Sequence, residues 1–280
     1  MNIRITADST CDLSPEYIAA HRIGIIPLTV NMGGVDYVDG ADITPDAIFS
    51  HVSSGGELPK TAAVNTAQYA ERFRALLREC DAILHFNISA EFSSCHANAV
   101  AAAQGLPVRC IDTRNLSSGI ALVLAEAVDM IEGGCGDVDA VAAHCEATIP
   151  KVDASFILDR LDYLHKGGRC SMVAMLGANL LHLKPCIEVV DGRMIVGKKF
   201  RGAYQRCLKQ YVADRLRDPD AVNGKRVFIT HTGVSREDFE IVRAETLARK
   251  DFREVIEVRA GCSITSHCGE NTLGILFNRA

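Results

Sequence analysis

The sequence contains no tryptophan, and aromatic residues make up only 6% of its 280 positions. Recognition of bases or sugars often relies on stacking against aromatic rings, so this shortage argues against both classes of ligand. Basic residues are not in excess, because 30 Lys and Arg stand against 35 Asp and Glu for a net charge of −5. Nucleic acid is therefore not an expected partner. No apolar run approaches the roughly 20 residues that a membrane-spanning helix needs.

Motifs for metals, nucleotides and serine hydrolases are missing as well. Cysteine and histidine occur close together at His144-Cys145, at His165 and Cys170, and at His267-Cys268. These do not form the two close-spaced ligand pairs of a structural zinc site, so we expect no metal. Neither the glycine-rich dinucleotide pattern nor the P-loop is present, and no Gly-x-Ser-x-Gly elbow supplies a hydrolase nucleophile.

The 11 cysteines are an odd number, scattered without Cys-x-x-Cys pairs. The opening residues Met1 to Ile5 have the pattern of a first strand rather than of a signal peptide. We therefore expect the cysteines to be reduced, small core residues of a cytoplasmic protein.

A strand-to-helix pattern occurs three times in the first 120 residues. Each short apolar run ends in Ser, Thr, Asp or Asn side chains, after which the chain turns helical. Because the carboxyl ends of parallel strands share one edge of a sheet, toward which the following helices point their N-termini, this pattern predicts a binding crevice for an acidic group. The three runs with their polar ends are Ile3 to Ala7 with Asp8-Ser9-Thr10, Ala82 to Phe86 with Asn87-Ile88-Ser89, and Val108 to Ile111 with Asp112-Thr113.

Alternating strands and helices predict an α/β fold of two domains. Residues 1–153 have the pattern of a mostly parallel α/β/α sheet with right-handed crossovers. The pattern changes near residues 150–155, which we take as the boundary. Residues 154–280 have the pattern of an α+β domain with a mixed or antiparallel sheet, including a hairpin through Asp191-Gly192. A helix is expected over residues 172–183.

Several short motifs resemble those of the DegV family and occur in the family's order from residue 8 to about residue 277. The opening segment from Asp8 to Leu13 belongs to this set, and the stretch from Leu161 to Arg169 is the most telling. No single motif decides the assignment, but the ordered set is specific. The remaining matching segments are Pro27-Leu28-Thr29-Val30, Tyr37-Val38-Asp39-Gly40, Leu58-Pro59-Lys60-Thr61-Ala62, Leu183-Lys184-Pro185 and Asp191-Gly192.

The resemblance implies a DegV-like two-domain fold in which a tunnel between the domains buries a long-chain fatty acid. Bacterial members of the family present the acyl carboxylate to a separate fatty acid kinase, which phosphorylates it. The chain is therefore expected to be a carrier rather than an enzyme, with a long-chain fatty acid as its ligand and no cofactor. A fatty acid kinase subunit is the expected protein partner, and the carrier role allows transient contact with a membrane surface.

Three polar residues are candidates for binding the fatty-acid carboxylate. Thr61 lies in the family's Pro-x-Thr segment and can donate to a carboxylate, although by itself it would be a helix-entry threonine. Ser93 keeps the serine of a Ser-Gly-Thr loop of the family, and it can bind the same group or cap the next helix. His267 keeps the histidine of a His-Thr-Gly-Pro-Gly segment, can donate to the acid, and can carry charge near neutral pH.

Two arginines are candidates for contact with the head group or with the kinase. Arg169 follows the Gly167-Gly168 helix stop, so its side chain is expected to project from a loop toward a carboxylate or an acyl phosphate. Arg201 precedes Gly202 to Gln205, where family members tend to continue with basic residues and this chain does not. Apolar residues that can line the tunnel, although such residues are more often core, are Ile26, Leu28, Leu158, Leu161, Met172, Met175, Leu176 and Leu180.

The sequence leaves two other classes of function open. One is an acyl hydrolase or transferase, built on a triad of Ser93, His267 and Asp8. In a second form of this alternative, Cys11 or Cys268 is the nucleophile. The other class is a binder of a different small or lipid anion, because the loops that follow Ser93 and His267 depart from the family pattern.

Overall fold

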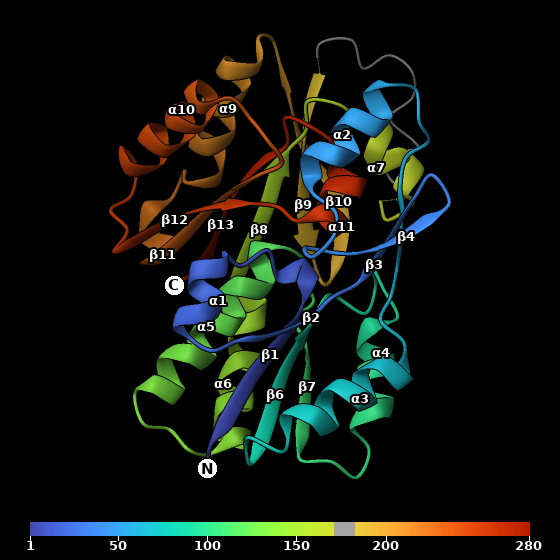
Figure 1. The fold of residues 1–280 in the computed structure, drawn as a ribbon. Helices are drawn as coiled ribbons and strands as arrows, with labels where there is room; N and C mark the ends of the chain where they lie inside the picture. The colour runs from blue at the N-terminus through green and yellow to red at the C-terminus, as the bar shows by residue number, and fades with distance from the viewer. Residues whose placement is uncertain (171–182) are drawn as a thin grey trace.

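The computed structural model describes residues 1–170 and 183–280. The N-terminal half is built on a fully parallel sheet in the order β2-β1-β6-β7. Figure 1 shows α3 and α4 on one side of this sheet and α5 and α6 on the other. The parallel sheet expected from the sequence is thus confirmed. The bounds are β1 Ile3–Asp8, β2 Gly24–Ile26, β6 Ala82–Asn87, β7 Val108–Asp112, α1 Pro15–Ala20, α3 Thr66–Leu76, α4 Cys95–Ala103, α5 Ser118–Glu132 and α6 Val138–Thr148.

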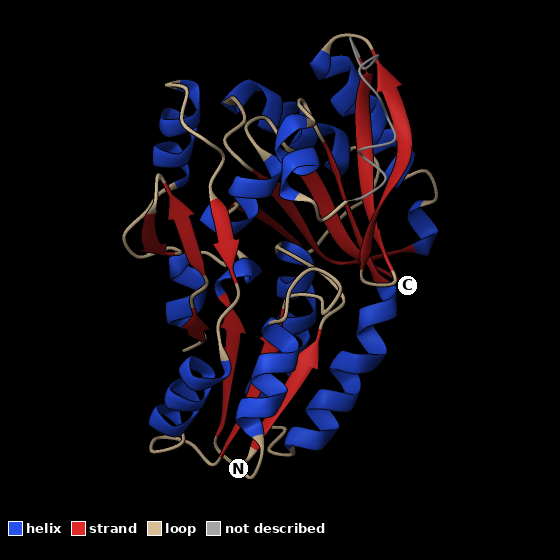
Figure 2. Cartoon of the chain, turned by 90° about the vertical axis from the view of Figure 1, so that its right-hand side faces the viewer, coloured by secondary structure: helices blue, strands red, loops and turns tan. Residues whose placement is uncertain are grey.

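The C-terminal half carries a mixed sheet in the order β10-β9-β8-β13-β11-β12, in which the β11 and β12 pair is parallel. Helices α9 and α10 pack against each other beside this sheet, while α5 of the N-terminal half contacts β8, β11 and β13. The two sheets lie one above the other in Figure 2. The bounds are β8 Val152–Ile157, β9 Leu183–Val190, β10 Arg193–Arg201, β11 Val222–His231, β12 Glu254–Arg259, β13 Leu273–Arg279, α7 Asp162–Gly167, α9 Tyr204–Arg215, α10 Arg236–Leu247 and α11 Cys262–Cys268.

A third, small sheet brings distant parts of the chain together. Its antiparallel strands have the order β4-β3-β5, and helix α2 follows β4 in the chain. The short helix α11, from the end of the chain, contacts β3, β5, α2 and α7. C-terminal residues therefore reach a site made mainly by N-terminal elements. The remaining bounds are β3 Thr29–Met32, β4 Val35–Val38, β5 Lys60–Ala62, α2 Pro45–Ser53, η1 Ser9–Cys11, η2 Ile149–Lys151 and η3 Pro219–Ala221.

Local sequence signals account for many of the element boundaries. Asn65 caps α3 with a full capping box, in which the Asn65 and Gln68 side chains each accept from the other residue's backbone N–H. Gly168 ends α7 in the left-handed conformation at φ 69°. The hairpin between β9 and β10 turns through Asp191 and Gly192, both with positive φ.

Other expectations changed in detail. Strand β8 begins at Val152, two residues before residue 154, where the second domain was expected to begin. The helix expected over 172–183 lies outside the described residues except for its last residue, Leu183, which begins β9. Helices α9 and α11 had not been expected.

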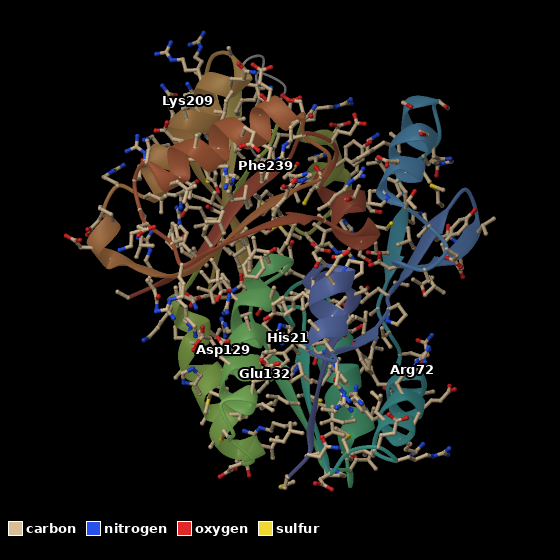
Figure 3. All side chains as sticks on the ribbon, turned by 60° about the vertical axis from the view of Figure 1, so that its left-hand side comes forward. His21, Arg72, Asp129, Glu132, Lys209 and Phe239 are labelled. Carbon is tan, nitrogen blue, oxygen red and sulfur yellow. The ribbon has the colours of Figure 1, made fainter. Side chains whose placement is uncertain are left out.

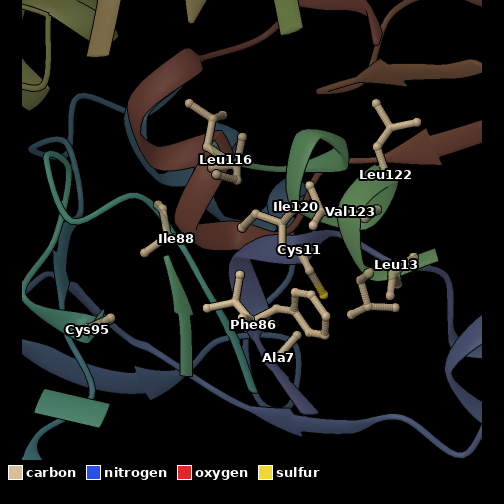
Figure 4. Close-up of a cluster of buried hydrophobic side chains, with 14 of the residues drawn as sticks. Ala7, Cys11, Leu13, Phe86, Ile88, Cys95, Leu116, Ile120, Leu122 and Val123 are labelled. Atoms are coloured by element: carbon tan, nitrogen blue, oxygen red, sulfur yellow. The ribbon is translucent and has the colours of Figure 1, made fainter. Parts of the chain in front are cut away.

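The largest hydrophobic core joins the two halves. Residues of the first sheet and of α5 pack in it with Phe156, Phe228 and Leu276 from the second sheet. Figure 4 shows the part of this core around Phe86, Ile120 and Leu116. A second cluster lies between the second sheet and helices α9 and α10. Because one apolar core spans both halves, the edge of the first sheet is held firmly against the elements that face it.

Candidate functional site

A cavity of about 280 Å³ lies beyond the carboxyl ends of β1 and β6, against helix α11. Parallel α/β sheets commonly place binding crevices at this position. Apolar side chains make up about half of its lining residues, and Thr61, Ser93 and His267 are among the polar ones. The apolar lining residues are Leu28, Ala63, Ile88, Phe92, Leu116, Met194, Ile264 and Cys268.

Two of the candidate carboxylate ligands form a direct hydrogen bond. Thr61 lies on β5, where it pairs with Val30 of β3, and His267 lies near the end of α11. Their Oγ1 and Nε2 atoms are 2.8 Å apart, although 206 residues separate them in the chain. The structure therefore brings the two residues together at one end of the cavity.

The imidazole of His267 is neutral at neutral pH. Burial, together with the smaller effect of the neighbouring Arg169 guanidinium, lowers its pKa to about 4. The expectation that this histidine can carry charge near neutral pH is therefore wrong, because the folded environment disfavours the imidazolium. Within the described part of the chain, Nδ1 has no hydrogen-bond partner and lies close to Gly167. A neutral ring of this kind can still donate one hydrogen bond.

Ser93 both lines the cavity and supports the start of α4. Its Oγ accepts from the backbone N–H of Cys95 at 3.2 Å and donates to the Cys95 thiol at 3.1 Å. The capping and ligand-binding interpretations are thus compatible, because the oxygen accepts from the Cys95 N–H while the hydroxyl proton can turn from the thiol toward a ligand. The thiol is buried, so its pKa is raised and it stays a neutral partner.

Arg169 stands where the cavity opens into a second hollow, which we call the vestibule. The vestibule has a volume of about 480 Å³ and shares Thr61, Arg169 and His267 with the cavity. Lys60 and Lys166 add two exposed cations to its wall, with Glu57 as an opposing charge. An anionic group held at Thr61 would therefore face a basic surface.

Arg201 does not join this site. It is exposed at the end of β10, where it pairs with Leu183 of β9, and it lines neither the cavity nor the vestibule. Among the described residues proposed for the tunnel wall, Leu28 lines the cavity, whereas Ile26, Leu158 and Leu161 do not. The four others proposed, Met172, Met175, Leu176 and Leu180, lie outside the described residues.

The hydrolase arrangement considered from the sequence is not assembled. His267 bonds to Thr61 rather than to Ser93, and Asp8 accepts from Tyr69 and from the Ile88 backbone instead. The thiols of Cys11 and Cys268 are buried, which raises the pKa of each to about 12 and disfavours a nucleophilic thiolate.

The described residues offer neither a metal site nor a membrane-spanning helix. Over residues 1–170 and 183–280, no cluster of three or more His, Cys, Asp or Glu side chains could hold a metal ion. Every helix in these ranges falls short of the length and apolar character needed to cross a membrane.

Comparison with known proteins gives consistent matches over the full chain. A family model described as an uncharacterised protein of the DegV family matches residues 2–280. A DegV domain-containing protein of Deinococcus radiodurans is 30% identical over 277 residues, which cover 98% of each chain. A DegV family protein of Thermus thermophilus, solved in a study of its fatty acid binding, is 27% identical, covers 100% of both chains and has a TM-score of 0.92. A stearic acid-binding protein of Eubacterium ventriosum is 25% identical, covers 99% of this chain and 98% of its own, and has a TM-score of 0.82.

Proposed function

This chain belongs to the DegV family, and we propose that it binds a long-chain fatty acid in the cavity and presents the carboxylate to a separate fatty acid kinase. The chain itself performs no chemistry on the acid, and we expect it to act in the cytoplasm. One observation carries the proposal. The Thr61 and His267 pair stands where an apolar cavity meets a basic vestibule.

The cavity suits an acid whose tail is buried and whose head is hydrogen bonded. Each methylene removed from water contributes about 0.8 kcal/mol, so a tail of about 16 carbons supplies ample affinity. A smaller hollow of about 30 Å³ shares Leu116, Ile264 and Cys268 with the cavity and extends toward Phe156 and Leu276. The tail would follow this apolar direction between the two sheets.

The carboxylate would be held by donors that the structure has already placed. If the His267 ring donates from Nε2 to Thr61, the threonine hydroxyl proton is free to donate to one carboxylate oxygen. The Ser93 hydroxyl faces the same cavity and can exchange its bond to the Cys95 thiol for one to the acid. A buried carboxylate needs such bonds, because an unpaired one would be costly.

The kinase would reach the carboxylate through the vestibule. A phosphoryl donor and the acyl phosphate product are both anionic, and Lys60, Lys166 and Arg169 give the vestibule a matching charge. Arg201, which lies away from the cavity, is left with a role at the kinase interface alone. Fatty acid loading would involve transient contact with a membrane surface.

Native mass spectrometry of the protein as purified from cells, with extraction of the bound lipid, tests the binding step. We expect one long-chain acid per chain, and we expect most of it to be lost from Thr61→Val and from Ser93→Ala. Thr29→Val is the matched control, because Thr29 lies on the adjacent strand β3 and does not line the cavity. An empty protein that also ignores added hexadecanoate would contradict the proposal and favour a different small or lipid anion.

The presentation step needs a separate assay. The loaded protein would be incubated with ATP and a kinase-containing cell extract, and the acyl phosphate trapped with hydroxylamine as the hydroxamate. Trapping that depends on the protein and falls in Arg169→Ala, with the acid still bound, is the expected result. Equal amounts of hydroxamate with and without the protein would contradict the proposal that it presents the acid for phosphorylation.

A further inference from the structure

The N-terminus of helix α11 is held by two buried carboxylates from the other half of the chain. Asp12 Oδ1 accepts from the backbone N–H of Gly261 at 2.8 Å, and Asp39 Oδ1 accepts from that of Cys262 at 3.0 Å. Gly261, the residue before α11, supplies no capping side chain. The two donors would otherwise be unpaired at the helix start, so Asp12 and Asp39, which we call the carboxylate pair, replace a local cap.

Each member of the pair is also tied to a loop that borders the cavity. Asp12 Oδ2 accepts from the Ser117 hydroxyl at 2.5 Å, and Asp39 Oδ2 accepts from the Ser9 hydroxyl at 2.8 Å. Ser9 Oγ in turn accepts from the backbone N–H of Leu28 at 3.1 Å. Leu28 lines the cavity, and so does Leu116, which precedes Ser117. The carboxylate pair thus connects the cavity wall to α11.

Backbone strain is concentrated at this connection. Ser117 has φ 51° and ψ −137°, a conformation that residues other than glycine rarely adopt, and Asp12 has φ 53°. Such conformations cost about 1–3 kcal/mol each and persist where the surroundings impose them. Here they bring the Ser117 hydroxyl and the Asp12 carboxylate into one hydrogen bond.

We propose that Asp12 and Asp39 are positioning residues that fix α11 so that His267 faces Thr61 at the head-group end of the cavity. The pair holds the first turn of the seven-residue helix, and His267 stands near its last residue. This inference rests on the proposed function, because it assigns the pair a role in placing a carboxylate ligand. Neither aspartate contacts the acid in this arrangement.

The protonation state of Asp12 affects the hydrogen bonds of the carboxylate pair. Burial, with a smaller contribution from the charge of Asp39, raises the pKa of Asp12 to about 8. The hydrogen bonds with Ser117 and Gly261 act in the opposite direction but are outweighed. Asp12 is therefore largely protonated at neutral pH, and in that form its hydroxyl donates to Ser117 Oγ across the same bond while Oδ1 still accepts from Gly261. Loss of this proton as the pH rises through about 8 places an ionised carboxylate in the buried site and disfavours it. The other ionisable groups around it are Cys11, Cys262 and Cys268, whose pKa burial raises to about 12, together with Asp8 beside Cys11 and Arg259 beside Cys262.

The two aspartates should respond differently to amide substitution. In Asp12→Asn the amide can still accept from Gly261 through its oxygen and donate to Ser117 through its nitrogen, as protonated Asp12 can. In Asp39→Asn the amide nitrogen would face Ser9, whose hydroxyl proton then loses its acceptor. We therefore expect the asparagine to restore function at position 12 but not at position 39.

The test compares the affinities of hexadecanoate and hexadecanol, which share a tail and differ in the head group. A positioning role predicts that Asp12→Ala and Asp39→Ala lower the acid-to-alcohol affinity ratio about tenfold, the loss expected for one hydrogen bond to a charged group. General damage to the fold would lower both affinities together and leave the ratio unchanged. Asp129→Asn is the control, since Asp129 joins α5 to Lys225 and Arg226 away from the cavity (Figure 3).

The pH profile supplies a second readout if an alanine variant does not fold. In the unmodified protein the acid-to-alcohol ratio should fall as the pH rises through about 8, and in Asp12→Asn it should stay flat. A ratio that is unchanged in both alanine variants, or that Asp39→Asn leaves as high as Asp12→Asn does, overturns the positioning role. A protein that binds neither ligand, or whose ratio ignores Thr61→Val, instead contradicts the proposed function.

Discussion

Two polar clusters lie near the carboxyl edge of the first sheet, and each contains a histidine. The first, which we call the Asp8 cluster, consists of Thr6, Asp8, Tyr69, His85 and Asn87, all fully buried. Asp8 accepts from the Tyr69 hydroxyl at 2.5 Å, from Asn87 Nδ2 and from the Ile88 backbone. The His85 ring is bonded on one side to Thr6 and on the other to Asn87.

The second cluster, at the head-group end of the cavity, is less completely bonded. His267 uses Nε2 toward Thr61 and leaves Nδ1 without a partner among the described residues, and Ser93 bonds to a weakly accepting thiol. A fully bonded buried network stabilises a fold, whereas the Thr61 and Ser93 hydroxyls beside the cavity can redirect their protons toward a ligand, as the proposed function requires. The two histidines thus differ in their hydrogen-bond partners, although neither ring is exposed.

The comparison predicts the largest effect on stability at Asp8. Asp8→Ala would leave the Tyr69 hydroxyl and the Ile88 N–H, both buried, without their acceptor, so we expect a loss of at least about 3 kcal/mol in the free energy of unfolding. Urea denaturation measures it. Asp36→Ala is the control, because that carboxylate bonds Asn31 on an exposed hairpin and should cost within about 0.5 kcal/mol. Equal losses in the two variants would abolish the distinction between the clusters.

His267 should make stability depend on pH. Its folded pKa, about 4, lies below the unfolded value of about 6.5, so the unfolded chain binds more protons between these values. The contribution is complete above pH 6.5 and is lost as the pH falls toward 4, with about 2 kcal/mol gone by pH 5. We expect this loss in urea denaturation of the unmodified protein but not of His267→Gln, whose amide remains neutral. Parallel pH profiles for the two proteins would show that the ring is not buried in its neutral form.

Short-range sequence patterns predicted the features that depend on neighbouring residues. The Asn65 cap with Gln68 three positions on, and the Gly168 helix end, are decided within one turn of chain. Helix α11 was not predicted, because its start depends on residues that are distant in the chain. Its Ser- and Thr-rich sequence favours a helix weakly, and Asp12 and Asp39, more than 200 residues away, hold its start.

The candidate site was reachable from the sequence only through the family resemblance. The motifs marked Thr61, Ser93 and His267 separately, but their spacing could not show that the first and last are hydrogen bonded. Burial, which sets the neutral state of His267, is likewise a property of the packed chain. Ile26 and Leu158 have the same apolar character as Leu28, and only their place in the fold separates core from cavity wall.

A smaller effect is expected at Gly167, where a single added methyl group tests whether the position of the His267 ring matters for binding of the acid. A Cβ added there would lie 2.4 Å from His267 Nδ1, so Gly167→Ala must displace the imidazole or the end of α7. Gly167 does not have a positive φ, so the backbone itself accepts alanine. We expect hexadecanoate affinity to fall about tenfold and the free energy of unfolding to fall by about 1 kcal/mol, measured by isothermal titration and urea denaturation.

Gly168→Ala provides the opposite case in the same loop. Gly168 has φ 69° and an added Cβ would meet nothing within 4 Å, so this substitution should lower the free energy of unfolding by about 1 kcal/mol and leave affinity unchanged. The pair of variants separates backbone strain from displacement of the ring. If Gly167→Ala also binds normally, the orientation of His267 does not govern binding of the acid, and the hydrogen bond between His267 and Thr61 is a structural contact rather than part of a binding site.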